Sequence, residues 1–186
     1  MKIVSSGLVL TDGINFLGCK ITGQDIYDIP KGKIDEGETP LEACIREVLE
    51  ETGVIVNKLD LIDLGLYKYI PTKDLHLFYL FVDKLPDVDK LWCSTYFTHP
   101  KSGREIPEIN GYLHVALNDY KLCMGKSLNL TLGNVFNEYE KYFTEDGYLY
   151  LLAQQRLQNG EFISEEEVLE QFGITEEDLD IDVDIE

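Results

Sequence analysis

The stretch from Gly32 to Val54 reads GKIDEGETPLEACIREVLEETGV, and it contains a helix with its own start and end signals. Thr39 is the expected N-cap, Pro40 suits the first helical position, and Glu42 stands where a capping-box acid returns a hydrogen bond to the cap. Gly53 can take the left-handed conformation that closes a last helical turn. The sequence therefore predicts a helix between Thr39 and Gly53.

This helix has one apolar and one acidic side. The apolar residues follow the i, i+3, i+4, i+7, i+8 spacing of a face that packs on a core; they are Leu41, Cys44, Ile45, Val48 and Leu49. Glu47, Glu50 and Glu51 are three and four residues apart, so they cluster on a different face, roughly opposite the apolar one. Like charges at this spacing repel each other, and a divalent cation would offset the repulsion. Oxygen ligands favour Mg²⁺ or Mn²⁺ over zinc, whereas the alternative is a solvated acidic face.

The wider spacing favours the metal site over the solvated face. Gly32 is followed after five residues by Glu38, and after seven more by Arg46 and Glu47. Aliphatic residues and glycine then stand in fixed positions around the other two glutamates: Val48, Glu50, Glu51, Gly53 and Val54. This pattern resembles the Nudix box at every defined position, so the chain resembles the Nudix hydrolase family.

The resemblance implies a fold, a cofactor and a reaction. The implied fold is an α/β/α sandwich with a mixed central sheet, and the implied reaction is hydrolysis of a diphosphate linkage in a nucleoside diphosphate derivative. Glu47, Glu50 and Glu51 would hold Mg²⁺, for which Mn²⁺ can substitute. Arg46 would orient this cluster through an ion pair with Glu38. Two glycines of the box, Gly32 and Gly53, would be structural.

Composition narrows the remaining choices. The chain has 186 residues, 44% of them hydrophobic, which is enough for one domain with a substantial core. It has neither a long apolar run nor an N-terminal leader, so we expect a cytoplasmic protein without a membrane partner. The four cysteines and three histidines are scattered and indicate neither a zinc site nor a disulfide framework.

The net charge of −19 is unevenly distributed. Residues 164–186 hold 11 of the 35 acids and no base, which leaves 24 acids against 16 bases, or −8, for the rest of the chain. A broad electrostatic grip on nucleic acid needs clustered Lys and Arg, so the charge argues against an RNA track.

The segments around the box predict a sheet. We expect strands at Ile3–Leu10 and Ile14–Ile21 before it, and an antiparallel pair at Leu59–Ile70 and Leu75–Val82 after it. The segment Pro86–Pro107 is predicted to be a loop that walls the substrate site.

A late strand is predicted to end near Leu117. In the family an acidic residue often precedes this strand and assists the metal or the attacking water. Here Gly111 stands at the position directly before the strand, so Glu108 or Glu105 becomes the candidate. The general base is one of these two residues or one of the helix glutamates.

The C-terminal part is predicted to be helical and then acidic. Helices are expected at Leu128–Phe143, Tyr148–Gln158 and Ser164–Phe172. We therefore divide the chain into a Nudix domain at 1–146 and a small helical extension with an acidic tail at 147–186. The tail is expected to be disordered, with an edge strand or a docking segment for a protein partner as alternatives.

The substrate is predicted less narrowly than the reaction. The loop around Lys31, Gly32 and Lys33 resembles that of dinucleoside polyphosphate hydrolases and also that of the mRNA-decapping enzyme. The two lysines are candidate phosphate contacts, as is Arg104. Aromatic residues of the strand pair are candidate stacking partners for a base; the two we single out are Tyr67 and Tyr79.

A small nucleotide is the preferred substrate because of the acidic charge, and RNA 5′-cap hydrolysis is the alternative. A non-catalytic Nudix-like binding module is an alternative of another class, although modules of that class are usually recognised by a damaged box. Dimers are frequent in the family, so a homodimer is compatible with the sequence.

Overall fold

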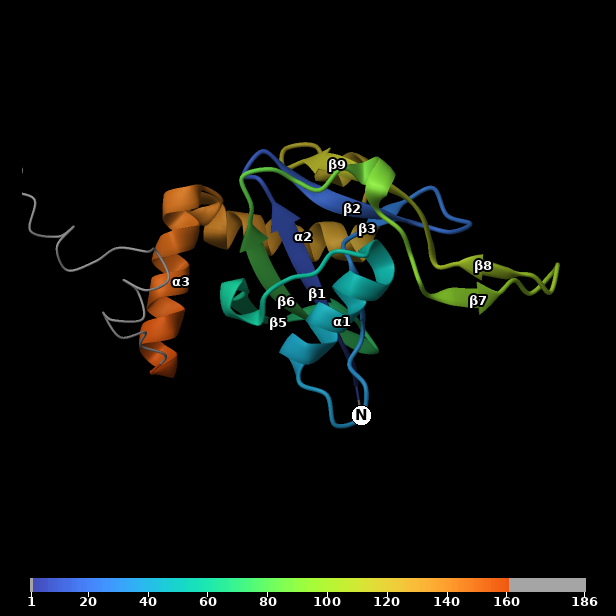
Figure 1. Cartoon of the computed structure of the whole chain (residues 1–186), viewed down its shortest axis with the longest axis horizontal. Helices are drawn as coiled ribbons and strands as arrows, with labels where there is room; N and C mark the ends of the chain where they lie inside the picture. The colour runs from blue at the N-terminus through green and yellow to red at the C-terminus, as the bar shows by residue number, and fades with distance from the viewer. Residues whose placement is uncertain (1, 161–186) are drawn as a thin grey trace, which may run out of the picture. The chain divides into compact units, whose positions relative to one another are not determined.

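The strand β1, at Ile3–Thr11, is the centre of the fold, because every residue from Ser5 to Thr11 is buried. The computed structural model of the chain describes residues 2–160 (Figure 1). β1 lies parallel to β6 and antiparallel to β2 and β4, so the sheet is mixed, as predicted. The order along the sheet is β3-β2-β1-β6-β5, with β4 paired to β1 and β9 paired to β2. Its other strands are β2 (Asn15–Ile21), β3 (Tyr27–Asp28), β4 (Lys31–Lys33), β5 (Ile62–Ile70), β6 (Lys73–Phe81) and β9 (Ile109–Ala116).

Two helices cover the sheet. α1 at Pro40–Thr52 packs on β1, and α2 at Lys126–Tyr139 packs on β5. In Figure 1, α1 crosses in front of β1 and α2 runs behind it, which gives the three layers of the expected α/β/α sandwich. Apolar side chains of all three layers form one buried cluster, and its largest members include Phe16, Leu17, Leu77, Leu128 and Leu132. Within residues 2–160, no helix is both long enough and apolar enough to cross a bilayer.

The signals that start and end α1 are present as predicted. Thr39 and Glu42 form a complete capping box, and Pro40 is the first helical residue. Gly53 has φ of 73° and donates its backbone N–H to the carbonyl of Leu49 at 2.8 Å. The apolar side differs in one position: Leu49 is 42% exposed, whereas Cys44 and Val48 are fully buried. The buried side of the helix is therefore shifted away from Leu49 and toward Glu47 and Glu51, which are buried as well.

The predicted loop at Pro86–Pro107 is only partly a loop, which corrects the prediction. It contains a separate hairpin, formed by β7 at Tyr96–Thr98 and β8 at Glu105–Pro107. The two strands pair only with each other and not with the main sheet. Short 3₁₀ turns replace other expected strand or loop ends; they lie at Lys58–Asp60, Val88–Lys90, Tyr120–Leu122 and Glu140–Tyr142.

The expected helix after the domain is present as α3, at Glu145–Asn159. Its residues up to Leu152 belong to the same compact unit as the sheet, and Tyr148 and Leu152 are buried in the common core. A second unit begins at Ala153. A domain boundary after Asp146 stays a prediction, and the expected helix at Ser164–Phe172 and the acidic tail lie outside the described residues.

Candidate active site

The glutamates of α1 are covered by the segment that precedes the helix. Glu47 and Glu51 are only 9% and 7% exposed, whereas the side chain of Glu50 is 34% exposed. The expectation of an acidic face opposite the core is therefore wrong for two of the three residues. Strand β4 pairs with β1 at Gly32–Ser6, and this pairing draws the backbone of the segment over the helix.

Gly32 makes this close approach possible. A Cβ atom at this position would overlap the carboxylate of Glu47. Gly53 is required at the other end of the helix, because it has a positive φ and the indole of Trp92 packs directly against it. Both box glycines thus have the structural role that the resemblance implies.

Arg46 joins three carboxylates of the site. Its guanidinium binds Glu38 through two hydrogen bonds of 2.8 Å, from Nε and Nη2. Its Nη1 donates to Glu47 at 2.6 Å and to Glu50 at 3.0 Å, and its Nη2 also donates to the carbonyl of Lys33 at 2.9 Å. The predicted Arg46–Glu38 pair is present, and the arginine ties the loop to the acidic side of α1.

Glu51 lies deepest among the three glutamates. One carboxylate oxygen accepts the backbone N–H of Lys31 at 2.9 Å, and the side chain of Tyr112 donates to the backbone carbonyl of Glu51 at 2.6 Å. Burial raises the pKa of Glu51 to about 8, and the charges of Glu47 and Asp28 act in the same direction, against the effect of Lys31. The hydrogen bond and the charge of Lys31 therefore do not fully offset the cost of ionising the buried carboxyl of Glu51.

Glu47 is in a similar situation. Burial raises the pKa of its carboxyl above the ordinary value, and the charges of Glu50 and Glu108 add to this effect, while Arg46 opposes it. Glu108 therefore lies close enough to act on Glu47. Glu105 is the first residue of β8, and both Glu105 and Glu108 are exposed.

The donor atoms of these carboxylates suit a hard divalent cation. Buried carboxylates with raised pKa values need a positive charge nearby if they are to ionise at neutral pH. Oxygen donors are the ligands that Mg²⁺ and Mn²⁺ prefer. Within residues 2–160, no group of three or more His, Cys, Asp and Glu side chains is arranged so that it could hold a metal ion. Arg46 binds two of the three helix glutamates, Glu47 and Glu50.

The side chain of Lys31, a predicted phosphate contact, is engaged within the protein, and its role toward phosphate stays a prediction. Its Nζ pairs with Asp28 at 2.8 Å, and it lies over the ring of Tyr69 at 5.8 Å from the centroid. Burial lowers the pKa of Lys31, but the carboxylate of Asp28 outweighs this effect and the net pKa is raised. The backbone of Lys31, rather than its side chain, serves the site by binding Glu51.

Other candidate substrate contacts lie in different places. Tyr79 is 1% exposed and donates to the carbonyl of Tyr142 at 2.9 Å, so it belongs to the core and its predicted stacking role is wrong. Tyr67 is half-buried on β5, where Tyr139 is its neighbour. The side chains of Lys33 and Arg104 are exposed, the first on β4 and the second in the β7–β8 hairpin.

Sequence reasoning missed three residues of the site. Asp28 pairs with Lys31, and Tyr112 holds the end of α1 near Glu51. Burial and the charge of Lys31 lower the pKa of Lys73, whereas the charges of Glu47 and Glu51 act in the opposite direction. Lys73 lies between the two strands predicted at Leu59–Ile70 and Leu75–Val82, and it is the first residue of β6 in the structure. The parallel pairing of β6 with β1 brings it near the box.

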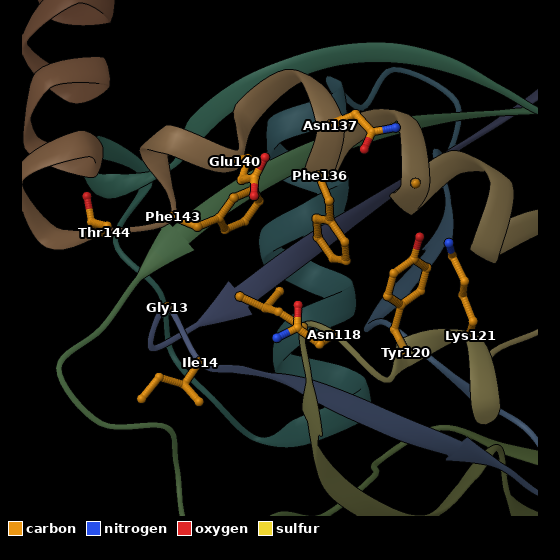
Figure 2. Close-up of a pocket in the computed structure, with 12 residues that line it drawn as sticks. Gly13, Ile14, Asn118, Tyr120, Lys121, Phe136, Asn137, Glu140, Phe143 and Thr144 are labelled. Carbon is orange, nitrogen blue, oxygen red and sulfur yellow. The ribbon is translucent and has the colours of Figure 1, made fainter.

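A pocket lies in another part of the fold. Its volume is about 630 Å³, and Figure 2 shows residues of α2 and of the loop after β9 around it. The rings of Tyr120 and Phe136 meet edge to face at 5.0 Å within its lining. Gly13, at the other end of β1 from the Gly32–Ser6 pair, also lines it. None of the predicted site residues lies in this lining, so we assign the chemistry to the carboxylates of α1 and not to this pocket.

Comparison with known proteins identifies the family of the chain. The NUDIX domain family matches residues 3–120. An uncharacterized 17.7 kDa protein of Enterobacteria phage T4, from the e-segB intergenic region, is 33% identical over 147 residues, which cover 73% of this chain and 97% of that protein. An RNA pyrophosphohydrolase of Helicobacter pylori is 32% identical over 139 residues, covering 72% of this chain and 84% of that protein.

A solved structure extends the agreement to the fold. The crystal structure of a putative Nudix hydrolase family member from Chromobacterium violaceum superposes with a TM-score of 0.53 and 19% identity, covering 84% of this chain and 90% of that one. Members of the family typically need a divalent metal. The chain belongs to the Nudix hydrolase family, and it is a pyrophosphohydrolase, a hydrolase that acts on phosphoric anhydrides.

Proposed function

We propose that the chain hydrolyses, with Mg²⁺, a diphosphate linkage in a small nucleoside diphosphate derivative, and that dinucleoside polyphosphates are the preferred class. The observation that carries this proposal is the pair of buried glutamates, Glu47 and Glu51, beneath the backbone of Gly32. Mn²⁺ can replace Mg²⁺, because both ions are hard and accept oxygen ligands.

The three helix glutamates would hold the cation. When it is bound, it neutralises charge on the phosphate oxygens and lowers the pKa of a water molecule. Arg46 keeps Glu47 and Glu50 in place through its bonds to both residues and to Glu38. Lys73 provides a positive charge beside the site that can face the phosphate chain.

Glu108 is the general base in this proposal. It is exposed, and its charge acts on Glu47, so a carboxylate oxygen can take the proton of a water molecule that attacks near the helix. Glu105 lacks this placement. The helix glutamates are left to bind the cation, and Tyr112 fixes the backbone around Glu51.

RNA with a 5′-polyphosphate end is the second candidate substrate. The RNA pyrophosphohydrolase of Helicobacter pylori favours it, because the similarity extends over 84% of that protein. The charge of −8 outside residues 164–186 favours the small nucleotide.

A nucleotide panel tests the proposal. The full chain is incubated with diadenosine tetraphosphate, ATP and a 5′-triphosphorylated oligoribonucleotide, each with Mg²⁺, with Mn²⁺ and with EDTA, and the products are separated by chromatography. We expect metal-dependent cleavage, with the highest kcat/KM for diadenosine tetraphosphate. Metal-dependent cleavage of the oligoribonucleotide alone would replace the first candidate by the second.

A further inference from the structure

The β7–β8 hairpin forms an arm, defined here as residues 95–108. Its pairing is regular from base to tip: Tyr96, Phe97 and Thr98 face Pro107, Ile106 and Glu105. One backbone hydrogen bond of 3.0 Å extends the ladder at the base, from Glu108 to Thr95, and one of 2.8 Å extends it at the tip, from His99 to Arg104. Figure 1 shows the arm projecting from the side of the main sheet.

The arm is attached directly to the end of α1 that carries the active-site glutamates. The backbone N–H of Ser94 donates to the carbonyl of Glu50 at 2.7 Å, and the Ser94 hydroxyl donates to the same carbonyl at 3.1 Å. The backbone N–H of Trp92 donates to the carbonyl of Thr52 at 3.3 Å. The position of the arm is therefore fixed relative to the site at its base.

The two faces of the arm differ in chemistry. Side chains alternate along a strand, and residues directly opposite each other in an antiparallel pair share a face. One face therefore contains Glu108, Phe97, Ile106, His99 and Arg104, in order from base to tip. The other face contains Tyr96, Pro107, Thr98 and Glu105. Only the first face runs from the carboxylate of Glu108 at the base through apolar side chains to a cation.

The tip of this face is basic and ordered. Residues 99–104 include Lys101 and Arg104 and no acid, in a chain whose net charge is −19. The ring nitrogen Nδ1 of His99 accepts the backbone N–H of Ser102 at 3.2 Å and lies 3.0 Å from the Ser102 hydroxyl. Gly103 closes the turn with φ of 66° and donates to the carbonyl of His99 at 2.9 Å. These contacts define the backbone of the turn that carries both cations.

The length of the arm determines what it can reach. Glu108 and Arg104 are four positions apart along the strand, which at ~3.3 Å per residue is about 13 Å. A phosphate group hydrolysed beside Glu47 lies at the base of the arm and not at its tip. The tip can contact only a part of the substrate that extends well beyond the cleaved linkage.

We propose that this face of the arm binds the second nucleotide unit of the substrate, with its base against Phe97 and its phosphate near Arg104. The proposal rests on the proposed function, because it concerns the part of the same substrate that lies beyond the hydrolysed linkage. A nucleobase presents an aromatic face that stacks on an aromatic side chain, and an exposed arginine pairs with phosphate. The second nucleoside of a dinucleoside polyphosphate and the following nucleotide of an RNA share this chemistry.

Single substitutions on the two faces test the proposal. Phe97→Ala is compared with Tyr96→Ala, which removes an exposed aromatic ring from the opposite face of the same strand. Arg104→Ala is compared with Lys141→Ala, which removes an exposed cation between α2 and α3. Circular dichroism and Tm check that each variant is folded.

The measurements are kcat/KM for ATP, diadenosine tetraphosphate and a 5′-triphosphorylated octaribonucleotide, and the Kd of a non-hydrolysable diadenosine tetraphosphate analogue. We expect Phe97→Ala and Arg104→Ala to lower kcat/KM about tenfold for a substrate with a second nucleotide. The Kd of the analogue should rise by the same factor, and kcat/KM for ATP should not change. Tyr96→Ala and Lys141→Ala should equal the wild type. If kcat/KM falls only for diadenosine tetraphosphate, the arm binds the second nucleoside of a dinucleoside polyphosphate. If it falls only for the octaribonucleotide, the arm binds the following nucleotide of an RNA.

Equal losses for ATP and the longer substrates, or no loss for any of them, would overturn the role of the arm while the hydrolase activity stands. If the wild type cleaves none of the three substrates, the proposed function fails instead. In that case the Kd of the analogue still tests whether the arm binds the second nucleotide. An unchanged Kd in Phe97→Ala and Arg104→Ala would contradict this role of the arm.

Discussion

At the scale of single residues, the site depends on two buried carboxylates, those of Glu47 and Glu51. It also depends on Gly32, whose lack of a side chain leaves room for the carboxylate of Glu47. The spacing of the box predicts which glutamates matter, because side-chain direction on a helix follows from residue number. It cannot predict that Glu47 and Glu51 are buried, since their cover comes from β4, which pairs with β1 outside the box. The sequence does not reveal Asp28 either, because its partner Lys31 fits the role of an exposed phosphate contact equally well.

Gly32→Ala should impair activity more than stability. The added Cβ meets the end of a flexible side chain, the carboxylate of Glu47, which can move aside without unfolding the protein. The displaced carboxylate then loses its position next to Arg46 and the cation. We expect kcat/KM to fall at least about tenfold, which is about 1.4 kcal/mol, while Tm changes little.

Gly111→Ala is the matched control for this substitution. A Cβ at Gly111 would meet Lys20 no closer than 3.6 Å, which is an ordinary contact. Both variants are assayed for turnover and thermal unfolding. Wild-type turnover in Gly32→Ala would mean that the position of Glu47 is not critical.

The metal-free protein should become less stable as the pH rises toward 8. The pKa of Glu51 is about 8 in the folded protein and near its ordinary 4.5 in the unfolded chain. Between these values the folded state binds a proton that the unfolded state has lost, so protonation stabilises the fold and this contribution disappears as the pH rises. Glu51→Gln removes the titrating group and should therefore reduce the loss of stability between low and high pH.

The measurement is Tm in EDTA at pH 5.5 and pH 7.5. We expect the decrease between these pH values to be smaller in Glu51→Gln than in the wild type by at least about 2 °C. Glu36→Gln, a change of an exposed glutamate in the preceding loop, should keep the wild-type slope. Identical slopes in all three proteins would contradict the burial of an ionisable Glu51.

At the scale of elements, α1 is the best predicted part of the molecule. Its capping box, first proline and terminal glycine are local signals, and each is present in the structure. The hairpin at Tyr96–Thr98 and Glu105–Pro107 was expected to be a loop, because its strands are three residues long and carry prolines and glycines around them. Short strands contain too few alternating residues for a period of two to be recognised.

The register of this hairpin separates the two candidates for the late acidic residue. Glu105 and Glu108 are three residues apart and therefore belong to opposite faces of the arm. Of these two residues, Glu108 is the one whose charge contributes to the raised pKa of Glu47. We expect Glu108→Gln to lower kcat about 100-fold, in the range of a general base, with a smaller change in KM.

Glu105→Gln should leave kcat within about twofold of the wild type, because surface changes of this kind have small effects. Steady-state kinetics of the two variants with diadenosine tetraphosphate provide the comparison. Equal effects of the two substitutions would remove Glu108 from its proposed role.

At the scale of the whole molecule, the mixed sheet and its covering helices agree with the α/β/α sandwich that the box implies. The sequence predicts the long strands of the sheet but neither the short strands β3 and β4 nor the parallel pairing of β1 with β6, which links residues about 70 positions apart. That pairing brings Lys73 near the box and therefore completes the charge pattern of the site. Contacts of this kind depend on the whole sheet and have no local signal.

The central claim is that the glutamates of α1 form a metal-dependent hydrolytic site. The most direct test is the turnover of diadenosine tetraphosphate by the wild type and by Glu51→Gln, with Mg²⁺ and with EDTA, together with circular dichroism of both proteins. The account predicts turnover only by the wild type with Mg²⁺, and a folded Glu51→Gln variant that releases no product. Near-normal turnover by Glu51→Gln, or equal turnover by the wild type in EDTA, would contradict it.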